Sequence, residues 1–288
     1  MRTARWNMAW VTTDDLTEYL AAAGAFLRSR PVENTVALTV LEVLRARGDA
    51  AFGDAGPLYG WWPEADGISG AFLVTPPYPV ALSSTPPESV EPLAEMLASA
   101  GTPVAGLSAE PATAQAFAAA WRQRTGTTPE TSMRQRLFSL GELVPPAPAP
   151  CGRARAAQTA DRDLVVAWFA AFASEAGARD SDHHNAVDDR LSYGGLTLWE
   201  DEGQPVSLAG LTRQVAGMTR VGPVYTPPQH RRHGYGAGVT AAVSRRALQA
   251  GAAEVVLFTD LANPTSNALY LRLGYRPVQD RVELAFAA

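Results

Sequence analysis

A segment rich in proline and alanine near the middle of the 288-residue chain most constrains how the chain can fold. Residues 144–152 read Val-Pro-Pro-Ala-Pro-Ala-Pro-Cys-Gly. Because proline has no amide hydrogen and a fixed φ, such a run fits neither a helix interior nor a central strand. The segment predicts a semi-rigid, extended spacer. We therefore expect one domain over residues 1–143 and another over residues 153–288, each long enough to bury a core.

The two halves show the same order of predicted elements: two helices, three strands, a helix, a strand, a helix and a final strand. In the first half, Asp14 and Asn34 are candidate helix caps. We predict two copies of one α/β fold of the mixed α+β type, each a mostly antiparallel sheet flanked by helices. The predicted helices cover residues 14–26, 34–46, 88–100, 112–124, 161–176, 182–190, 237–250 and 266–272. The predicted strands cover residues 58–62, 69–75, 80–83, 104–107, 133–140, 196–200, 206–212, 219–225, 254–259 and 281–286.

Composition excludes several kinds of chemistry. All 24 basic residues are arginine, so mechanisms that need a lysine, such as a Schiff base or a P-loop, are excluded. Cys151 is the one cysteine and the four histidines lack the spacing of a zinc site, so we expect no metal. The N-terminus has no long apolar run, and the pI of about 5.4 argues against nucleic-acid binding. We expect a cytoplasmic protein without a membrane segment.

The most informative segment runs from Val221 to Gly238, where a predicted strand enters a glycine-rich turn that opens a helix. Glycines allow a tight turn and a close approach to a ligand, and the helix start adds free amide donors. The stretch from Gly203 to Ala253 contains six arginines and no carboxylate, which suits a polyanionic ligand. A tight turn with exposed arginines is the alternative.

A second informative segment follows the next predicted strand. It reads Thr259-Asp-Leu-Ala-Asn-Pro-Thr-Ser-Asn-Ala-Leu-Tyr and continues to Leu273-Gly274-Tyr275. Asn263 can hydrogen-bond an extended amide ligand, and Tyr270 can donate a proton to a leaving group. An ordinary Asn-Pro turn and a core tyrosine are the alternatives for these two residues.

Together these residues resemble the GNAT superfamily of acyl-CoA-dependent N-acyltransferases over roughly residues 153–288. The sequence Arg231-Arg-His-Gly-Tyr-Gly236 fits the family's pyrophosphate loop, Gln/Arg-x-x-Gly-x-Gly/Ala. The family's later motif, an Asn followed by a small residue and a Tyr, is matched by Asn263, Ser266 and Tyr270. The resemblance implies acetyl-CoA as co-substrate and direct attack of an amine on its thioester. It implies that Tyr270 protonates the departing thiolate and that CoA is bound by Val224, Tyr225, Thr226, Arg231, Arg232, His233, Gly234, Tyr235, Gly236, Ala237, Asn263 and Ser266.

The resemblance does not identify the general base. The attacking nitrogen must be neutral, which requires a carboxylate, a histidine or an ordered water. Asp260, at the end of the predicted strand before Asn263, is the first candidate. Glu175, His183 and His184 are the next, and a surface or capping role is the alternative for each.

The first half lacks the pyrophosphate loop. At the corresponding place stands Ser83-Ser-Thr-Pro-Pro-Glu-Ser-Val-Glu91, where prolines remove amide donors and glutamates repel phosphate. We predict that residues 1–143 are a degenerate GNAT-like domain that does not bind CoA. This half also carries the net charge of −5, with ten arginines against fifteen carboxylates.

The sequence thus predicts an N-acetyltransferase that acts on a primary amine, as a monomer or homodimer, with its active site in the second half. A CoA-binding sensor or scaffold without catalysis remains the alternative. The acceptor and the acyl chain length are left open.

Overall fold

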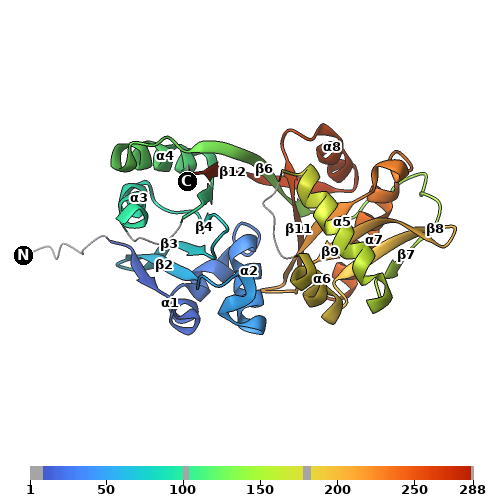
Figure 1. The fold of residues 1–288 in the computed structure, drawn as a ribbon, viewed down its shortest axis with the longest axis horizontal. Coiled ribbons are helices and arrows are strands. Elements are labelled where there is room, and N and C mark those ends of the chain that lie inside the picture. Colours follow the sequence, from blue (N-terminus) through green and yellow to red (C-terminus); the bar gives the residue numbers. More distant parts are fainter. Residues whose placement is uncertain (1–8, 100–103, 178–182, 287–288) are drawn as a thin grey trace, which may run out of the picture. The chain divides into compact units, whose positions relative to one another are not determined.

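The computed structural model describes residues 9–99, 104–177 and 183–286, and its contacts divide the chain into two compact units (Figure 1). Unit 1 contains the chain up to Leu137, the short segment Asp260–Ala262 and the residues from Val278 onward. Unit 2 contains Phe138–Thr259 and Asn263–Pro277. The Pro/Ala segment therefore lies inside unit 2, and two long strands, β6 and β12, contribute residues to both units.

Unit 1 is built from four helices and seven strands among its described residues. The helices are α1 (Leu16–Ser29), α2 (Thr35–Arg47), α3 (Val90–Ser99) and α4 (Pro111–Thr125). The strands are β1 (Val11–Thr13), β2 (Leu58–Glu64), β3 (Gly67–Val74), β4 (Val80–Leu82), β5 (Gly106–Ala109), β6 (Glu130–Leu140) and β12 (Tyr275–Ala285). Their order in the sheet is β1-β2-β3-β4-β5-β12-β6. The pair β4–β5 is parallel, whereas β2–β3, β3–β4 and β5–β12 are antiparallel.

Unit 2 repeats this plan. Its helices are α5 (Arg162–Glu175), α6 (His183–Ser192), α7 (Tyr235–Gln249) and α8 (Pro264–Arg272). Its further strands are β7 (Arg153–Ala156), β8 (Leu196–Asp201), β9 (Gln204–Leu211), β10 (Met218–Tyr225) and β11 (Glu254–Asp260), in the sheet order β6-β11-β10-β9-β8-β7. Again one pair, β10–β11, is parallel, and β7–β8, β8–β9 and β9–β10 are antiparallel. The predicted fold class and the repeated order of elements are confirmed.

Each unit has its own hydrophobic core. In unit 1 the core lies between the sheet and helices α3 and α4, and it includes Trp62, Phe72 and Phe117 together with Val282 and Leu284 of β12. In unit 2, residues of α7 pack on one face of β9–β11, against side chains such as Val221 of β10 and Leu257 of β11. The other face of the sheet is covered by α5 and α6 around Phe169 and Val187. The sheet of unit 2 is therefore buried on both faces.

Helix α1 shows how local chemistry sets an element boundary. The predicted cap Asp14 is not the cap: the helix begins at Leu16, and the Asp15 carboxylate accepts hydrogen bonds from the amides of Thr17 and Glu18 at 2.6 and 3.2 Å. Asn34 does stand at the start of α2, but its side chain makes no capping bond and donates instead to the Leu27 carbonyl. The sequence motif D-D left the choice between the two aspartates open, because either can serve as a cap.

The Pro/Ala segment is held by contacts within unit 2. The Trp199 indole Nε1 donates to the Cys151 carbonyl at 2.7 Å, and the Val144 amide donates to the Leu273 carbonyl at 3.0 Å. A Cβ added at Gly238 would come within 2.8 Å of the Pro150 ring, so Pro150 lies directly against the first turns of α7. The segment lacks regular structure, as its prolines predict, yet it packs against its own unit.

Candidate functional site

The parallel strands β10 and β11 separate partway along their length within unit 2. Their pairing with each other runs from Met218 opposite Glu254 to Val221 opposite Leu257, and within the described residues it does not continue beyond that point. Beyond it, Gly222–Tyr225 of β10 and Phe258–Asp260 of β11 no longer pair with each other, although β10 resumes its pairing with β9 at Val224. The two edges that face each other therefore have backbone groups without ladder partners across the gap, so an extended ligand can hydrogen-bond there.

The sequence of β10 explains the separation. Gly222 has a φ of +155°, which favours glycine, and the residue that follows it is Pro223, which has no amide to donate. The register between β9 and β10 shifts at the same place, between Val221 and Val224. A bulge of this kind bends a strand and ends its pairing with a neighbour.

The loop after β10 places free amides at the start of α7. Arg232 and Gly234 have left-handed backbones, with φ of +68° and +82°, and Gly234 stands at the N-cap of the helix without a side-chain cap. The residues from Arg231 to Gly234 are exposed. An uncapped helix start with exposed preceding amides is a binding site for an anion such as a phosphate, because its N–H groups and dipole both favour negative charge.

The three glycines of this loop have different surroundings. A Cβ on Gly236 would meet only the Thr226 hydroxyl, at 3.5 Å, so this position is open. A Cβ on Gly238 would come within 3.0 Å of the Trp199 ring and closer still to Pro150, so this glycine serves packing. Gly234 is needed for its positive φ. Of the three, only Gly236 leaves room that a ligand can use.

Side chains fix the end of β10 and the loop. The Ser207 hydroxyl of β9 bonds both the Tyr225 carbonyl, at 3.0 Å, and the Thr226 hydroxyl, at 2.8 Å. Arg231 donates from Nε to the Thr226 carbonyl at 2.9 Å. The Tyr235 hydroxyl donates to Asp201, and this hydrogen bond, with burial, raises the pKa of Tyr235 to about 12. Ser207 and Asp201 were not singled out in the sequence, because nothing in the sequence shows which residues of β8 and β9 face the loop.

Glu175 and Arg231, predicted in separate roles, form an ion pair. The Arg231 guanidinium lies 2.6 Å from the carboxylate of Glu175 at the end of α5, and the Tyr225 hydroxyl donates to the same carboxylate at 3.2 Å. Both partners are almost half exposed, so the pair contributes little to stability. It joins α5 to the predicted pyrophosphate loop.

The second motif has a local structural role as well. The Asn263 side chain caps α8 by accepting a hydrogen bond from the Ser266 amide at 3.0 Å. Asn267, which the sequence reading missed, donates to the Asn263 carbonyl at 2.7 Å and accepts from the Thr259 hydroxyl at 2.7 Å. Asn263 is exposed, so its amide nitrogen and its surroundings remain open to a ligand.

Tyr270 is buried on α8, and its ring meets that of Tyr275 edge to face at 5.9 Å. Burial raises the pKa of Tyr270 to about 12, so its hydroxyl is protonated at neutral pH. No hydrogen bond to this hydroxyl is found among the described residues, whereas the Tyr275 hydroxyl is bonded to Ser244 at 2.7 Å. Within the described residues, the Tyr270 hydroxyl is therefore available as a proton donor to a ligand.

The candidate bases come from different elements. Asp260, the last residue of β11, is exposed and accepts a hydrogen bond from the Ala262 amide at 2.8 Å. His184 is exposed beside Arg162, whose guanidinium pairs with Asp188 at 2.6 Å. His183 opens the same helix, α6. Glu175 is the candidate base that directly contacts predicted CoA-binding residues.

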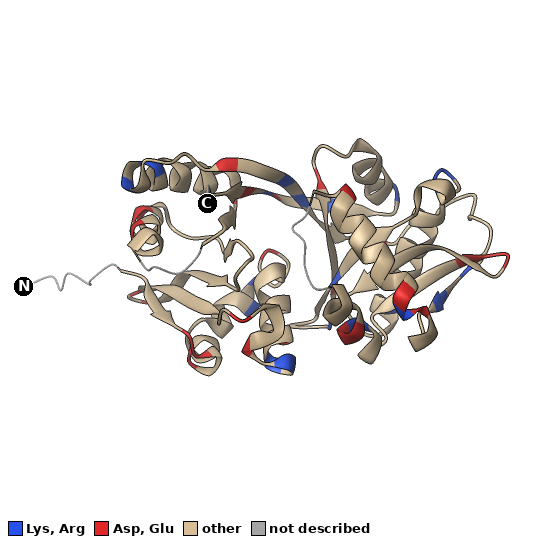
Figure 2. Ribbon diagram, viewed as in Figure 1, with Lys and Arg blue, Asp and Glu red and all other residues tan. Residues whose placement is uncertain are grey.

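In unit 1 the corresponding parallel pair is closed by an arginine. The buried Arg281 of β12 donates to the carbonyls of Leu82, at the end of β4, and of Ser108, in β5, at 2.8 and 2.7 Å. The pairing of β4 with β5 reaches Ala81 opposite Ser108, so the guanidinium bonds both strands where the gap opens in unit 2. Figure 2 shows the charged residues of β12 among those of the described part of the chain. From the sequence, prolines and glutamates are expected to block this place, and the role of Arg281 is not predicted.

We expect the substitution Arg281→Ala to lower the free energy of unfolding by about 2–3 kcal/mol, because it leaves the buried Leu82 carbonyl and the partly buried Ser108 carbonyl without the guanidinium donor. Urea denaturation followed by circular dichroism measures the effect. Arg272→Ala is the control, since Arg272 is exposed on α8 and has no partner among the described residues. Equal stabilities of the two variants would show that Arg281 does not hold the strand ends together.

The described residues contain no group of three or more histidine, cysteine or carboxylate side chains placed to hold a metal ion. Within the same ranges, no helix combines the length and the apolar character needed to cross a membrane.

Comparisons with known proteins agree with this geometry. Residues 161–275 match the model of the Acetyltransferase (GNAT) family. This segment begins just before α5 and ends as β12 starts, so it contains both the parted strands and the loop at α7. A search of curated proteins found no match.

Solved structures resemble the chain over nearly its whole length. A GCN5-related N-acetyltransferase from Sphaerobacter thermophilus aligns with a TM-score of 0.61 and 17% identity, covering 96% of this chain and 94% of its own. A tandem GNAT protein from the clavulanic acid biosynthesis pathway aligns with a TM-score of 0.56 and 14% identity, covering 97% and 98%. A Drosophila protein aligns with a TM-score of 0.70 and 13% identity, covering 97% and 99%. At these identities the likeness concerns the fold: residues 161–275 match the Acetyltransferase (GNAT) family model, within a chain that has the fold of a tandem GNAT protein.

Proposed function

We propose that this protein is an N-acetyltransferase that transfers the acetyl group of acetyl-CoA to a primary amine in unit 2. The observation that carries the proposal is the parting of β10 and β11 beside the uncapped start of α7, inside the segment that matches the family. An extended amide chain fits the first feature and a pyrophosphate fits the second. In the same proposal unit 1 is a degenerate copy that does not bind CoA, because Arg281 fills its corresponding gap.

Each part of the CoA molecule has a place in this proposal. The backbone of Val224, Tyr225 and Thr226 would align the pantetheine arm, and an amide there would polarise the thioester carbonyl. The pyrophosphate would lie on the amides of the loop and of the first turn of α7. The residues of this second group are Arg231, Arg232, His233, Gly234, Tyr235, Gly236 and Ala237. Asn263 and Ser266 would border the pantetheine arm from the start of α8.

The proposed reaction needs no enzyme nucleophile. The neutral amine attacks the thioester carbon, the carbon–sulfur bond breaks, and the nitrogen loses a proton as the amide forms. The CoA thiolate takes the proton of the Tyr270 hydroxyl, which is regenerated from solvent. Asp260 is the proposed base for the amine, with Glu175 as the alternative, since Glu175 already accepts a hydrogen bond from Tyr225 at the end of β10.

Titration calorimetry with acetyl-CoA tests the proposal. We expect one equivalent to bind per chain, because among the described residues the gap between the parallel strands is open in unit 2 and bridged by Arg281 in unit 1. A panel of amines, followed by thiol release, should then reveal turnover. A folded protein that binds no acetyl-CoA would refute the proposal, and two equivalents would refute the assignment of unit 1. Binding without turnover on any amine would instead identify a CoA sensor or scaffold.

A further inference from the structure

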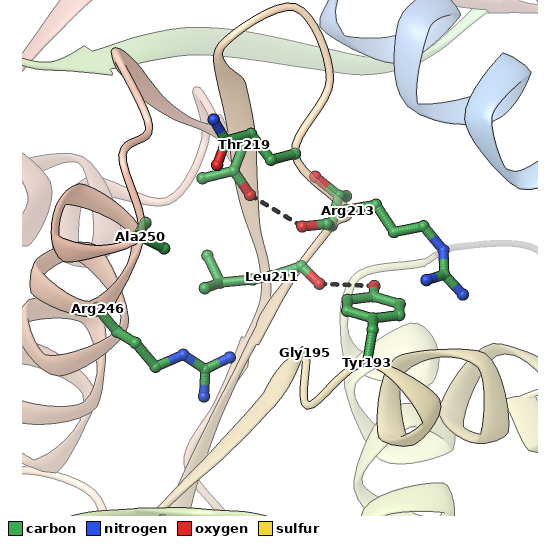
Figure 3. Close-up of a pocket in the computed structure, with 10 residues that line it drawn as sticks. Tyr193, Gly195, Leu211, Arg213, Thr219, Arg246 and Ala250 are labelled. Atoms are coloured by element: carbon green, nitrogen blue, oxygen red, sulfur yellow. Dashed lines mark hydrogen bonds between the residues drawn. The ribbon is translucent and has the colours of Figure 1, made fainter.

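Four of the six arginines in the carboxylate-free stretch lie outside the loop that precedes α7. The sequence reading assigned all six to the surroundings of the CoA loop, and only Arg231 and Arg232 lie in that loop. Arg213, Arg220 and Arg246 instead gather around Tyr193, which follows α6, and Arg190 of α6 joins them. Figure 3 shows Arg213 and Arg246 with Tyr193 around a cavity of about 150 Å³. We call these four arginines the Tyr193 cluster.

Two members of the Tyr193 cluster have partners. Arg213 lies over the Tyr193 ring, 4.1 Å from its centre, and pairs with Asp189 at 2.7 Å. Arg246 donates to the Gly194 carbonyl and to the Thr197 hydroxyl. Asp189 is the one carboxylate in contact with a cluster arginine among the described residues.

The other two members have no carboxylate partner in the described part of the chain. Arg190 donates to the Ala186 carbonyl of its own helix at 3.1 Å, and its Nε is buried without an acceptor. The Arg220 guanidinium, partly buried on β10, makes no hydrogen bond or ion pair with residues 9–99, 104–177 or 183–286; its hydrogen bonds to Thr212 are made by the backbone. The Arg190 guanidinium lies over the ring of Phe169 of α5, 5.5 Å from its centre, and it is close enough to Arg220 for the two like charges to repel.

This arrangement is costly in the absence of a ligand. Burial, and secondly the charge of Arg190, lower the pKa of Arg220 to about 10, although the side chain keeps some exposure. A cation removed from water without a partner destabilises a fold, so such groups are usually paired. An anion bound between Arg190 and Arg220 would remove the repulsion and supply the missing acceptors.

The position of Arg220 connects the cluster to the proposed reaction. Val221 packs in the core with α7, and Thr219 lines the cavity with residues of α7, so the alternation of a strand directs Arg220 to the face covered by α5 and α6. Tyr225 lies on that same face, beside Trp168 and Glu175 of α5. Gly222, where β10 leaves β11, is two residues beyond Arg220, roughly 7 Å along the strand.

We propose that Arg190 and Arg220 bind a carboxylate of the acceptor, so that the substrate is an amine bearing a carboxylate, such as an amino acid. The inference rests on the proposed function and specifies its acceptor. The guanidinium of Arg220 extends from the strand on which the thioester would lie. A small molecule held there by its carboxylate would bring its amine toward the opening at Gly222.

Matched amines test the proposal. Amino acids and their carboxamides, for example glycine with glycinamide and phenylalanine with phenylalaninamide, are compared by thiol release with acetyl-CoA. We expect the best amino acid to exceed its carboxamide by about 10- to 100-fold in kcat/KM, the range for hydrogen bonds to a charged group. The carboxamide has the less basic amine and hence more of the neutral nucleophile, so simple amine reactivity works against the expected preference.

Variants show which residue causes the preference for an amino acid over its carboxamide. Arg220→Gln should lose most of it, Arg220→Lys should keep a part, and Arg245→Gln should keep all of it, because Arg245 is exposed on α7 outside the cluster. Arg220→Gln should melt at the same temperature as the wild type or higher, since it removes an unpaired cation. A lower melting temperature with an unchanged preference would assign Arg220 a structural role and overturn the proposal.

The outcomes separate this proposal from the proposed function. Without acetyl-CoA binding or turnover on any amine, the proposed function fails. If amines are acetylated with no advantage for a carboxylate, or if phosphoethanolamine exceeds every amino acid, the proposed function stands and the carboxylate site fails. A preference that Arg220→Gln leaves intact also refutes the site.

Discussion

Replacing Tyr270 by phenylalanine should lower kcat by about 100-fold or more while leaving the affinity for acetyl-CoA unchanged. General acid catalysis contributes roughly 10²–10⁴-fold to a rate, and this hydroxyl is the proposed proton donor to the thiolate. The substitution removes no hydrogen bond found in the described structure, so the fold should keep its stability. Thiol release gives kcat, and titration calorimetry gives the affinity.

Tyr275 offers a matched control. It is the neighbouring buried tyrosine, and its hydroxyl is bonded to Ser244 at 2.7 Å. Tyr275→Phe should therefore reduce the free energy of unfolding by about 1–2 kcal/mol and leave kcat nearly unchanged. If Tyr270→Phe keeps full turnover, or if Tyr275→Phe reduces kcat equally, Tyr270 is not the acid.

The pH dependence of the wild type checks the same assignment. Because burial raises the pKa of Tyr270 to about 12, the proton is present at every pH below that value and is lost only as the pH rises toward it. We expect no decline of kcat that depends on Tyr270 between pH 7 and 10. A decline in this range that disappears in Tyr270→Phe would contradict the raised pKa.

Placing a glutamate at Gly236 should weaken acetyl-CoA binding by at least 100-fold. The new carboxylate would lie in the first turn of α7, where the pyrophosphate is proposed to bind, and like charges in such contact cost several kcal/mol. The protein itself can accommodate the side chain, because a Cβ at this position meets only the Thr226 hydroxyl at 3.5 Å. A negative charge near a helix N-terminus is favourable, so folding should be preserved.

Gly236→Gln separates charge from size. Glutamine has the shape of glutamate without its charge, so its loss of affinity should be clearly smaller than that of Gly236→Glu. Calorimetry on both folded variants makes the comparison. Unchanged affinity in Gly236→Glu would show that the phosphates of CoA do not bind at the start of α7.

The elements of the fold could largely be predicted from the sequence, because most of them depend on local chemistry. Hydrophobic periodicity and turn residues indicated each helix within a few residues. Three features of the fold were not predicted from the sequence. The short edge strands β1 and β7 carry little pattern, and β12 begins at Tyr275, not Arg281, because its first part is exposed and polar. The division of β6 and β12 between two units depends on pairing over long sequence distances, which no local pattern encodes.

The candidate site was predictable where a motif specifies backbone geometry and obscure where side chains from distant elements meet. The positive φ of Gly234 and the helix start at Tyr235 follow from the glycine loop. The partners that hold the loop, Ser207 and Glu175, come from strands and helices far away in the sequence. A count of charges likewise suggested one basic region, and only the fold divides it between the CoA loop and the Tyr193 cluster.

The course of β12 governs the order in which the chain can complete its structure during synthesis. Val282 and Leu284 belong to the core of unit 1, and β12 pairs with β5 through four residues, yet this strand leaves the ribosome after all of unit 2. Unit 1, although encoded first, must wait for the end of the chain before its core closes. A fragment that ends at the Pro/Ala segment would lack β12, the strand that carries Arg281. We therefore expect that unit 1 cannot be produced as a stable protein by cutting the gene at this segment.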